Sequence, residues 1–505
     1  MLCRCRLLFL ALILALSGSI GLAKEEDAST MRPHILFVVM DDLGSHDLGM
    51  HKTGIATPCA DRLAADGVYL DNYYVLPSCS PTRSALLTGR YPLHTGIHNW
   101  LLSRSNIGLP LDEEVLPQVL GRANYRRHAV GKWHLGHSRW EFTPTFRGFE
   151  SFYGFYVGGQ DYFTHVDDDE GYDMRYDRQP NCGPGCSELR DERGNYTTHI
   201  FTREAIRVIQ QHHNENEEEP LFLYLAFQAV HAPDQVPESY RQAYENRTDW
   251  SDMRKTYAGM LTAADEGIAN VTQALKDNGL WDNTLVIFTT DNGGPTETCA
   301  IQGSSNFPRR GGKCTVWEGG TTGDGFVSGP ALSKLGVETG KRHNGLFHCV
   351  DWLPTLANMV GAVPQGKPLD GVDQLAALQQ KRAARQELFI GIGIDLDGSY
   401  YGPALRYGRW KIIENGGGPS LIPENTSQYY LFDILADRTE VNNLAEEKPF
   451  VLDWMKQKLK DYKSEMVPIP PEDPDCPFDG LVNTSLGLTW IPWCTDDPKE
   501  VVMYW

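Results

Sequence analysis

Short runs of almost uniformly apolar residues recur along the chain and predict buried strands. His34–Met40 (HILFVVM), Pro220–Ala229 (PLFLYLAFQA) and Thr284–Thr290 (TLVIFTT) carry apolar residues at both odd and even positions. Runs of this length and pattern are typical of strands that are buried on both faces of a sheet. Gly67–Val75 and Arg127–Trp133 are weaker strand candidates.

Helical patterns separate these runs. Glu114–Arg122, Thr197–His213 and Ser251–Asn278 have helical spacing, and the last carries Ala and Leu along one face. Asp351–Gly361 begins with Asp and ends with Gly, as a short helix does. Strands that alternate with helices predict an α/β fold, in which a mostly parallel sheet is covered by helices on both faces.

The pattern changes after about residue 380 and predicts a smaller α+β domain. Its expected elements are the strands Leu388–Ile392, Tyr407–Ile413 and Tyr429–Phe432 and the helix Pro449–Tyr462. The tail from Pro468 is rich in Pro and is expected to be an extended strap, which Cys476 and Cys494 are candidates to pin. The expected division is therefore a main domain over residues 24–380 and a smaller one over 381–505.

The first 23 residues have the layout of a cleavable secretory signal peptide. Arg4 and Arg6 precede the apolar run Leu7–Leu16, and small residues lead to Ala23. A membrane anchor is the alternative, but the apolar run is too short to span a bilayer. We expect a soluble protein in the secretory pathway, with no stable membrane span, that is either lysosomal or secreted.

Composition narrows the class of protein. The chain has 505 residues, of which 41% are hydrophobic, and this excludes a coiled coil, a disordered chain and a collagen-like fibre. Lys and Arg number 46 against 66 Asp and Glu, for a net charge of −20. Electrostatic binding of nucleic acid by the whole surface is therefore not expected.

Sequons and cysteines agree with the secretory pathway. Asn-x-Ser/Thr triplets occur at Asn195, Asn246, Asn270, Asn425 and Asn483. The chain has 11 Cys, and two of them lie in the signal peptide. The odd remainder predicts that one thiol is unpaired or chemically altered in an oxidising compartment. Cys182 and Cys186 are expected to close a small loop, and the other pairings stay open.

Oxygen side chains follow two of the predicted core strands. Asp41 and Asp42 come directly after His34–Met40, and Asp291 and Asn292 come after Thr284–Thr290. Ligands bind beyond the carboxyl ends of the strands in open α/β sheets. Four oxygen donors favour Ca²⁺ or Mg²⁺ over zinc. The alternative is that each Asp only caps the next helix.

The segment Cys79–Arg90 (CSPTRSALLTGR) carries the most specific signal. Its Cys-x-Pro-x-Arg followed by Leu-Thr-Gly-Arg resembles the signature of the type I sulfatases. The resemblance implies that a formylglycine-generating enzyme oxidises Cys79 to formylglycine, whose hydrated aldehyde is the nucleophile. This would also account for the odd cysteine count. The alternative is that Cys79 is a buried or disulfide-bonded residue.

The rest of the chain follows the order of that family. Gly131–Gly136 (GKWHLG) contributes Lys132 and His134, a histidine occurs at His231, and Lys313 precedes Glu318-Gly319-Gly320. The similarity covers nearly the whole mature chain, within the family it is greatest to the N-acetylgalactosamine-4-sulfatase (arylsulfatase B) group, and it implies an alkaline-phosphatase-like fold. Two departures, Thr321-Thr322 after the glycines and Cys314 after the lysine, lie near the expected substrate mouth and bear on the choice of substrate more than on the chemistry.

The resemblance also implies a role for each site residue. Asp41, Asp42, Asp291 and Asn292, with residue 79, would hold one Ca²⁺ per chain. Arg83 and Lys132 would hold the nucleophile and the sulfate, and His134 would take a proton from the formylglycine hydroxyl. His231, which shares the sulfate with Lys313, would protonate the leaving alcohol. The expected substrate is a sulfated carbohydrate, such as a glycosaminoglycan unit, or an aryl sulfate.

Two other functions remain open from the sequence. A phosphomonoesterase or phosphodiesterase of the same fold usually has a Thr or Ser nucleophile and zinc ligated by His and Asp. A catalytically inactive protein that binds sulfated glycans could keep the same scaffold. The presence of every motif residue argues against the inactive protein, and a turnover assay separates it from an enzyme.

Overall fold

The computed structural model describes residues 32–215, 218–297, 299–394, 400–420 and 428–494. The predicted signal peptide over residues 1–23 and the sequon at Asn425 lie outside the described residues. Across the described ranges, every helix is too short or too polar to cross a membrane.

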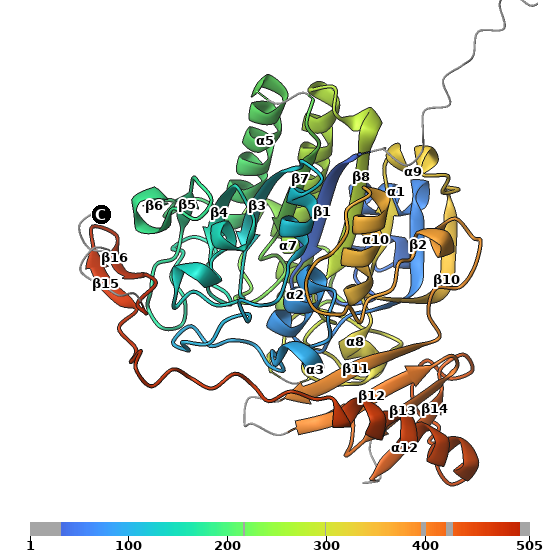
Figure 1. Ribbon diagram of the computed structural model, residues 1–505. Helices are drawn as coiled ribbons and strands as arrows, with labels where there is room; N and C mark the ends of the chain where they lie inside the picture. Colours follow the sequence, from blue (N-terminus) through green and yellow to red (C-terminus); the bar gives the residue numbers. More distant parts are fainter. Residues whose placement is uncertain (1–31, 216–217, 298, 395–399, 421–427, 495–505) are drawn as a thin grey trace, which may run out of the picture.

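One large, mostly parallel sheet dominates the chain (Figure 1). In the described residues its ten strands follow the spatial order β10 (Lys341–His348), β2 (Val68–Tyr74), β9 (Phe326–Ser328), β8 (Thr284–Thr290), β1 (His34–Met40), β7 (Leu221–Ala226), β3 (Arg126–Lys132), β4 (Ser151–Phe155), β5 (Arg175–Asp177) and β6 (Ser187–Leu189). β8, β1, β7, β3 and β4 run parallel to one another and form the core of the sheet. β9, which pairs with β8, is antiparallel to it. The predicted α/β architecture is confirmed.

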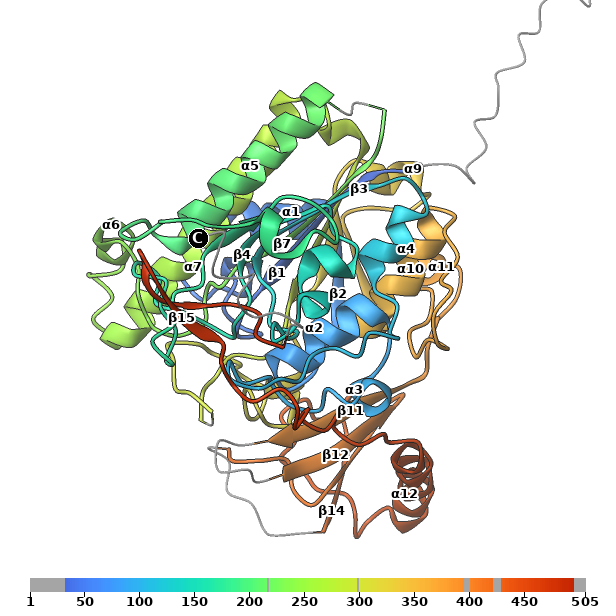
Figure 2. The same cartoon turned by 60° about the vertical axis from the view of Figure 1, so that its left-hand side comes forward.

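Helices cover both faces of this sheet, as Figures 1 and 2 show. The α-helices are α1 (Pro58–Asp66), α2 (Cys79–Thr88), α3 (Pro92–Thr95), α4 (Leu116–Gly121), α5 (Thr197–Glu215), α6 (Glu238–Gln242), α7 (Asp252–Asp277), α8 (Glu318–Thr321), α9 (Ala331–Lys334), α10 (Trp352–Met359), α11 (Leu375–Leu378) and α12 (Pro449–Ser464). Helices α5 and α7 lie on one face, and α2, α4 and α10 lie on the other. Alternate residues of β1 therefore enter two separate cores: Phe37 packs with the α2 side and Val38 with the α5 side. This explains why the β1 sequence is apolar at every position after His34.

A second, antiparallel sheet follows in the C-terminal part of the chain. It consists of β11 (Glu387–Ile394), β12 (Tyr400–Tyr407), β13 (Trp410–Glu414) and β14 (Tyr429–Asp433) in that order. Helix α12 packs on it through Met455 and Leu459, which are buried (Figure 1). The smaller α+β unit is thus confirmed, while the exact division between residues 380 and 381 stays a prediction.

The prediction of one strand over Tyr407–Ile413 is wrong. Tyr407 ends β12 and pairs with Trp410 at the start of β13, so a tight turn divides the segment. Gly408 in this turn has a φ of 55°, a left-handed conformation that glycine adopts readily. The apolar pattern on both sides of the turn concealed the hairpin.

The chain then returns to the large sheet as an extended strap (Figure 1). Val467 donates a backbone hydrogen bond to Leu93, and Trp490 donates one to Tyr172 beside the short hairpin β15 (Leu481–Thr484) and β16 (Gly487–Trp490). A disulfide joins Cys476 to Cys494, as expected for the strap.

The described cysteines form three disulfides: Cys182–Cys186, Cys299–Cys314 and Cys476–Cys494. Cys59, Cys79 and Cys349 are not paired, so the expectation of a single unpaired thiol is wrong. Cys349 is fully buried beside His348, and Cys59, the second residue of α1, donates its backbone N–H to Asp265. An odd number of cysteines shows only that at least one thiol is unpaired, not how many are.

Candidate active site

Neighbouring strands bring the predicted site residues to one edge of the large sheet. Met40 of β1 is in register with Thr290 of β8, and Val39 is in register with Ala226 of β7. Ala226 also pairs with Gly131 of β3. The residues that follow these parallel strands therefore meet at their shared carboxyl edge, as predicted. They are Asp41 and Asp42, Asp291 and Asn292, His231 and His134, and Lys132 is the last residue of β3 itself.

Helix α2 supplies Cys79 and Arg83. Cys79 is the first residue of the helix, and Arg83 lies one turn later on the same side. Thr82 accepts a hydrogen bond from the backbone of Leu76, which fixes the approach to the helix, and Gly89 ends it in a left-handed conformation. The helix is buried along its whole length, so the nucleophile candidate has a rigid support.

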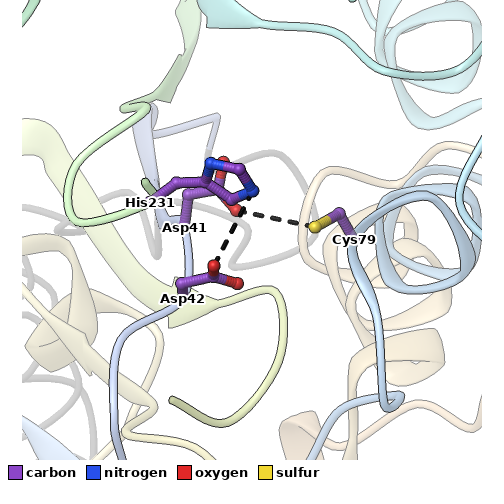
Figure 3. A group of neighbouring side chains, drawn as sticks. All are labelled: Asp41, Asp42, Cys79 and His231. Atoms are coloured by element: carbon purple, nitrogen blue, oxygen red, sulfur yellow. Dashed lines mark hydrogen bonds and ion pairs between the residues drawn. The ribbon is translucent and has the colours of Figure 1, made fainter. Parts of the chain in front are cut away.

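A cluster of carboxylate, thiol and imidazole groups forms the centre of the site (Figure 3). One ligand atom from each of Asp41, Asp42, Cys79 and His231 lies within 4.8 Å of the others. The Cys79 Sγ lies 3.7 Å from Asp41 Oδ1, and His231 Nε2 lies 3.7 Å from Asp42 Oδ2. Asp291 joins the cluster because its Oδ1 accepts the backbone N–H of Asp42 at 3.2 Å.

Three cationic side chains surround these carboxylates. Lys132 Nζ donates to Asp41 Oδ2 at 2.5 Å, and Lys313 Nζ donates to Asp42 Oδ2 at 2.8 Å. The guanidinium of Arg83 donates twice to Asp291 Oδ2. Three positive charges thus balance the three carboxylates, so a bound divalent cation would leave the site positive and suited to an anionic substrate.

Asn292 provides a test of whether the site fits a metal ion. Its Nδ2 donates to Asp42 Oδ1 at 2.7 Å, but its buried Oδ1 has no hydrogen-bond partner among the described residues. An orphaned buried carbonyl is costly unless a ligand satisfies it. With the oxygens of Asp41, Asp42 and Asp291 nearby, the donors fit a hard divalent cation. The His231 ring nitrogen also lies near these oxygens, although His231 was expected to contact only the sulfate.

Comparison with known proteins decides the family. The sequence model of the Sulfatase family matches residues 33–362, well over half of the chain. The chain belongs to the sulfatase family. Sulfate-ester hydrolysis is therefore the activity of this enzyme, and the family uses a metal ion and formylglycine for it.

Several relatives of this sulfatase are similar over most of their length. Arylsulfatase J of Mus musculus is 34% identical over 514 residues, which cover 94% of this chain and 82% of that protein. N-acetylgalactosamine-6-sulfatase of Homo sapiens is 32% identical over 377 residues, with coverage of 71% and 68%. The crystal structure of Ps i-CgsB in complex with k-i-k-neocarrahexaose has a TM-score of 0.76 at 29% identity, covering 87% of this chain and 94% of that one.

Burial makes the unmodified Cys79 thiol of the sulfatase a poor nucleophile. It raises the pKa of Cys79 to about 12, although Lys132 and Lys313 oppose the shift. A thiol with this pKa carries almost no thiolate at physiological pH, and the thiolate is the reactive form. The site therefore does not suit a conventional cysteine nucleophile.

The two site histidines are neutral in this environment. Burial lowers the pKa of His231 to about 3, and the charge of Lys313 contributes, while Asp42 opposes the shift. Burial, followed by the charge of Lys132, also lowers the pKa of His134 well below its ordinary value. His134 Nε2 lies 2.9 Å from the carbonyl oxygen of Leu101, and its buried Nδ1 has no hydrogen-bond partner in the described chain.

Some positioning groups gave no signal in the sequence. The Leu101 carbonyl fixes the His134 ring, and a backbone carbonyl has no side-chain signature. Asn306 donates to the carbonyls of Gly294 and Gly311, both of which precede Lys313, although nothing in its sequence context marks it. Cys314 was noted as unusual, but its partner could not be deduced from spacing.

Proposed function

We propose that this sulfatase removes sulfate from sugars of the glycosaminoglycan class and that it accepts aryl sulfates as simple substrates. The observation that carries the proposal is the enclosure of Cys79 by Arg83, Lys132 and Lys313 over a carboxylate cluster. The names of its relatives include an arylsulfatase and an N-acetylgalactosamine-6-sulfatase, which supports both substrate types. Greater similarity to the N-acetylgalactosamine-4-sulfatase group stays a prediction.

The nucleophile in this proposal is residue 79 after conversion of Cys79 to formylglycine by a formylglycine-generating enzyme. The hydrated aldehyde supplies a hydroxyl group for attack on sulfur. Its place at the first turn of α2 presents it to the carboxyl edge of the sheet, where Asp41 lies 3.7 Å from the present sulfur. The high pKa of the unmodified thiol supports the need for this conversion.

One Ca²⁺ per chain is the proposed metal. Asp41, Asp42, Asp291, Asn292 and residue 79 would hold it. Four of these groups offer oxygen, and the buried Asn292 Oδ1 has no other partner among the described residues. Bound there, the cation would supply Lewis-acid polarisation of the sulfate and a lower pKa for the formylglycine hydrate.

Arg83, Lys132 and Lys313 orient the anionic substrate. The Arg83 guanidinium donates to Asp291 and to the carbonyl of Lys132, and these two contacts fix the orientation of the group. Lys132, from β3, donates to Asp41, and Lys313, from the loop before α8, donates to Asp42. The two ammonium groups therefore reach the site from different parts of the fold. Preorganised cations of this kind stabilise charge that develops on the sulfate during bond cleavage.

His134 and His231 divide the proton transfers. When Nε2 of His134 donates to Leu101, Nδ1 keeps a lone pair and can take a proton from the residue 79 hydroxyl. When Nδ1 of His231 donates to the carbonyl of Ala232, Nε2 is directed at Asp42 and the sulfate region. A bound sulfate would raise the pKa of His231 toward the range in which it can protonate the leaving alcohol.

Secretory targeting completes the proposal. The protein would mature in the endoplasmic reticulum, where the formylglycine-generating enzyme acts, and then reach lysosomes or be secreted. The signal peptide over residues 1–23, the sequons and the described disulfides Cys182–Cys186 and Cys476–Cys494 support this route.

A substrate panel tests the function. Purified protein is assayed with sulfated disaccharides, an aryl sulfate, and phosphate monoesters and diesters, and we expect turnover of the sulfate esters. Preference for the phosphate esters would favour the phosphatase alternative, and absence of turnover in fully converted protein would favour the glycan-binding one. His231→Ala should slow the sugar sulfate more than the aryl sulfate, because the aryl leaving group needs little protonation.

A further inference from the structure

A disulfide lies directly beside Lys313. Cys314 follows Lys313 in the chain and is bonded to Cys299, which closes a loop over a sequence separation of 15 residues. Cys314 is fully buried, whereas Cys299 is half-buried. The function described above gives this crosslink no role.

The backbone that carries Lys313 has little conformational restraint of its own. Gly311 and Gly312 precede it, and glycine can adopt more backbone conformations than any other residue. Gly311 has a φ of 71°, and so does Cys314, which is a region that residues with side chains rarely occupy. Such a conformation persists only where the surroundings hold it.

Hydrogen bonds and the disulfide hold this stretch, and Thr315 donates its N–H back to the carbonyl of Gly312. Lys313 donates its N–H to Gly294, and Cys314 donates its N–H to Pro77 at 2.7 Å, two residues before Cys79. The backbone of the Lys313 loop is thus tied to the segment that presents the nucleophile. The disulfide adds a covalent tie on the side-chain side of Cys314.

We propose that the Cys299–Cys314 disulfide is a positioning element of the active site, which holds Lys313 over Asp42 in the geometry that binds sulfate. The Lys313 side chain is a point charge on a flexible four-carbon stem, so the position of its ammonium group depends on where the backbone places the start of the side chain. Nζ must span from that backbone to Asp42 Oδ2, where it lies at 2.8 Å. The inference rests on the proposed role of Lys313 in sulfate binding.

The rest of the loop has its own attachments, so the fold should survive loss of the disulfide. Asn306 donates to the carbonyls of Gly294 and Gly311 and accepts the N–H of Ser45. Ser305 donates its N–H to Asp47. Removing the crosslink should therefore free the Cys299 end. The Lys313 end keeps its backbone hydrogen bonds to Gly294 and Pro77, so its backbone stays folded but is no longer fixed by a covalent bond.

The test substitutes the half-buried partner, Cys299→Ser, and leaves the buried Cys314 unchanged. We expect the Kd of inorganic sulfate, measured by calorimetry, and the KM for an aryl sulfate to rise about tenfold or more. Unchanged formylglycine content at residue 79, checked by peptide mass spectrometry, excludes an effect on maturation. Cys182→Ser is the matched control, because it opens a disulfide of only four residues' separation, and it should leave both constants at the wild-type values.

A double-variant cycle separates positioning of Lys313 from general destabilisation. In a Lys313→Ala background, Cys299→Ser should not weaken sulfate binding further, because the group that it positions is gone. An equal further loss in that background would overturn the inference, and so would a Cys299→Ser enzyme with wild-type sulfate affinity. If the wild type releases no sulfate from any ester, the proposed function fails, but the calorimetric cycle still tests the positioning role on its own.

Discussion

Arg83 and Asp291 form a fully buried ion pair across 208 residues of sequence, with Arg83 Nε and Nη2 at 3.1 and 2.9 Å from Asp291 Oδ2. Arg83 lies in the second turn of α2, one turn after Cys79, and Asp291 follows β8. The pair therefore joins the element that presents residue 79 to the strand edge that presents the metal ligands. Its geometry needs the planar fork of arginine, which a lysine ammonium cannot reproduce.

The first prediction concerns that fork. Arg83→Lys keeps the charge but loses one of the two hydrogen bonds to Asp291, and we expect kcat/KM for an aryl sulfate to fall roughly 10²-fold. Arg104→Lys is the control, because Arg104 pairs with Asp169 at the surface and is 53% exposed. Steady-state kinetics of both variants check this, and wild-type kcat/KM in Arg83→Lys would refute the assigned role.

Much of the fold could be predicted because its core strands have an unambiguous pattern. β1 and β8 have the predicted bounds, and the residues after them meet as expected because the two strands are parallel and in register. The short strands β5 and β6, at one end of the sheet, were not predicted, since three residues carry too little pattern. The hairpin within Tyr407–Ile413 was missed because turn and strand residues are mixed there.

The site could be predicted as a set of residues but not as a geometry. The motif around Cys79 predicted the nucleophile, and the residues after two predicted strands predicted the carboxylates. The sequence does not show which cation pairs with which carboxylate. Lys313 reaches Asp42 from a loop 271 positions away, a contact that depends on how the loop closes. Long-range pairings of this kind, like Cys299–Cys314, are set by tertiary packing.

The second prediction concerns a buried charge cluster between the two sheets. Lys411 of β13 lies 3.0 Å from Glu318 of α8 and 2.8 Å from Glu440, and all three side chains are buried. Lys411→Met would remove the cation that contacts both buried carboxylates and leave Arg406 as the nearby positive charge, so it should lower the free energy of unfolding by about 3 kcal/mol.

The control for this variant is Lys341→Met. Lys341 pairs with Glu338 at the surface, where the two side chains are 46% and 67% exposed, and the change should cost at most about 1 kcal/mol. Denaturant unfolding of both variants gives the comparison. Similar losses would show that the buried cluster contributes no more than a surface pair.

The third prediction is that acid destabilises the fold through buried histidines. Burial lowers the pKa of His34 to about 4 and that of His128 to about 3, from an ordinary value of 6.5. The unfolded chain then binds more protons than the native one below pH 6.5, so stability falls as the pH drops from 6.5 toward 4. At pH 5 each group should cost about 2 kcal/mol.

The pH effect is measured by thermal unfolding at pH 7.5 and pH 5. His34→Asn keeps an acceptor for the Leu221 N–H that His34 now binds, and it should reduce the loss of Tm between the two conditions. His213→Asn is the control: His213 is a half-buried residue of α5, and its replacement should leave the loss of Tm between the two pH values unchanged. An unaltered loss in His34→Asn would mean that other groups control the acid response.

The fourth prediction concerns the metal ion. After removal of bound metal with a chelator, Ca²⁺ should restore activity better than Zn²⁺, and it should raise Tm by binding the native state alone. Asn292→Ala removes a buried oxygen donor and should weaken the rise of Tm with Ca²⁺. Asn283→Ala, at the opposite end of β8, should not. Reactivation by Zn²⁺ alone would contradict an oxygen-ligand site.

The central claim is that residue 79 must be formylglycine for sulfate release. The most direct measurement prepares the protein with graded amounts of co-expressed formylglycine-generating enzyme. Conversion at residue 79 is quantified by peptide mass spectrometry, and sulfate release from one sulfated substrate is measured on the same samples. We predict that the rate rises in proportion to the converted fraction and extrapolates to zero without it. A full rate in protein whose Cys79 is still an alkylatable thiol would contradict the account.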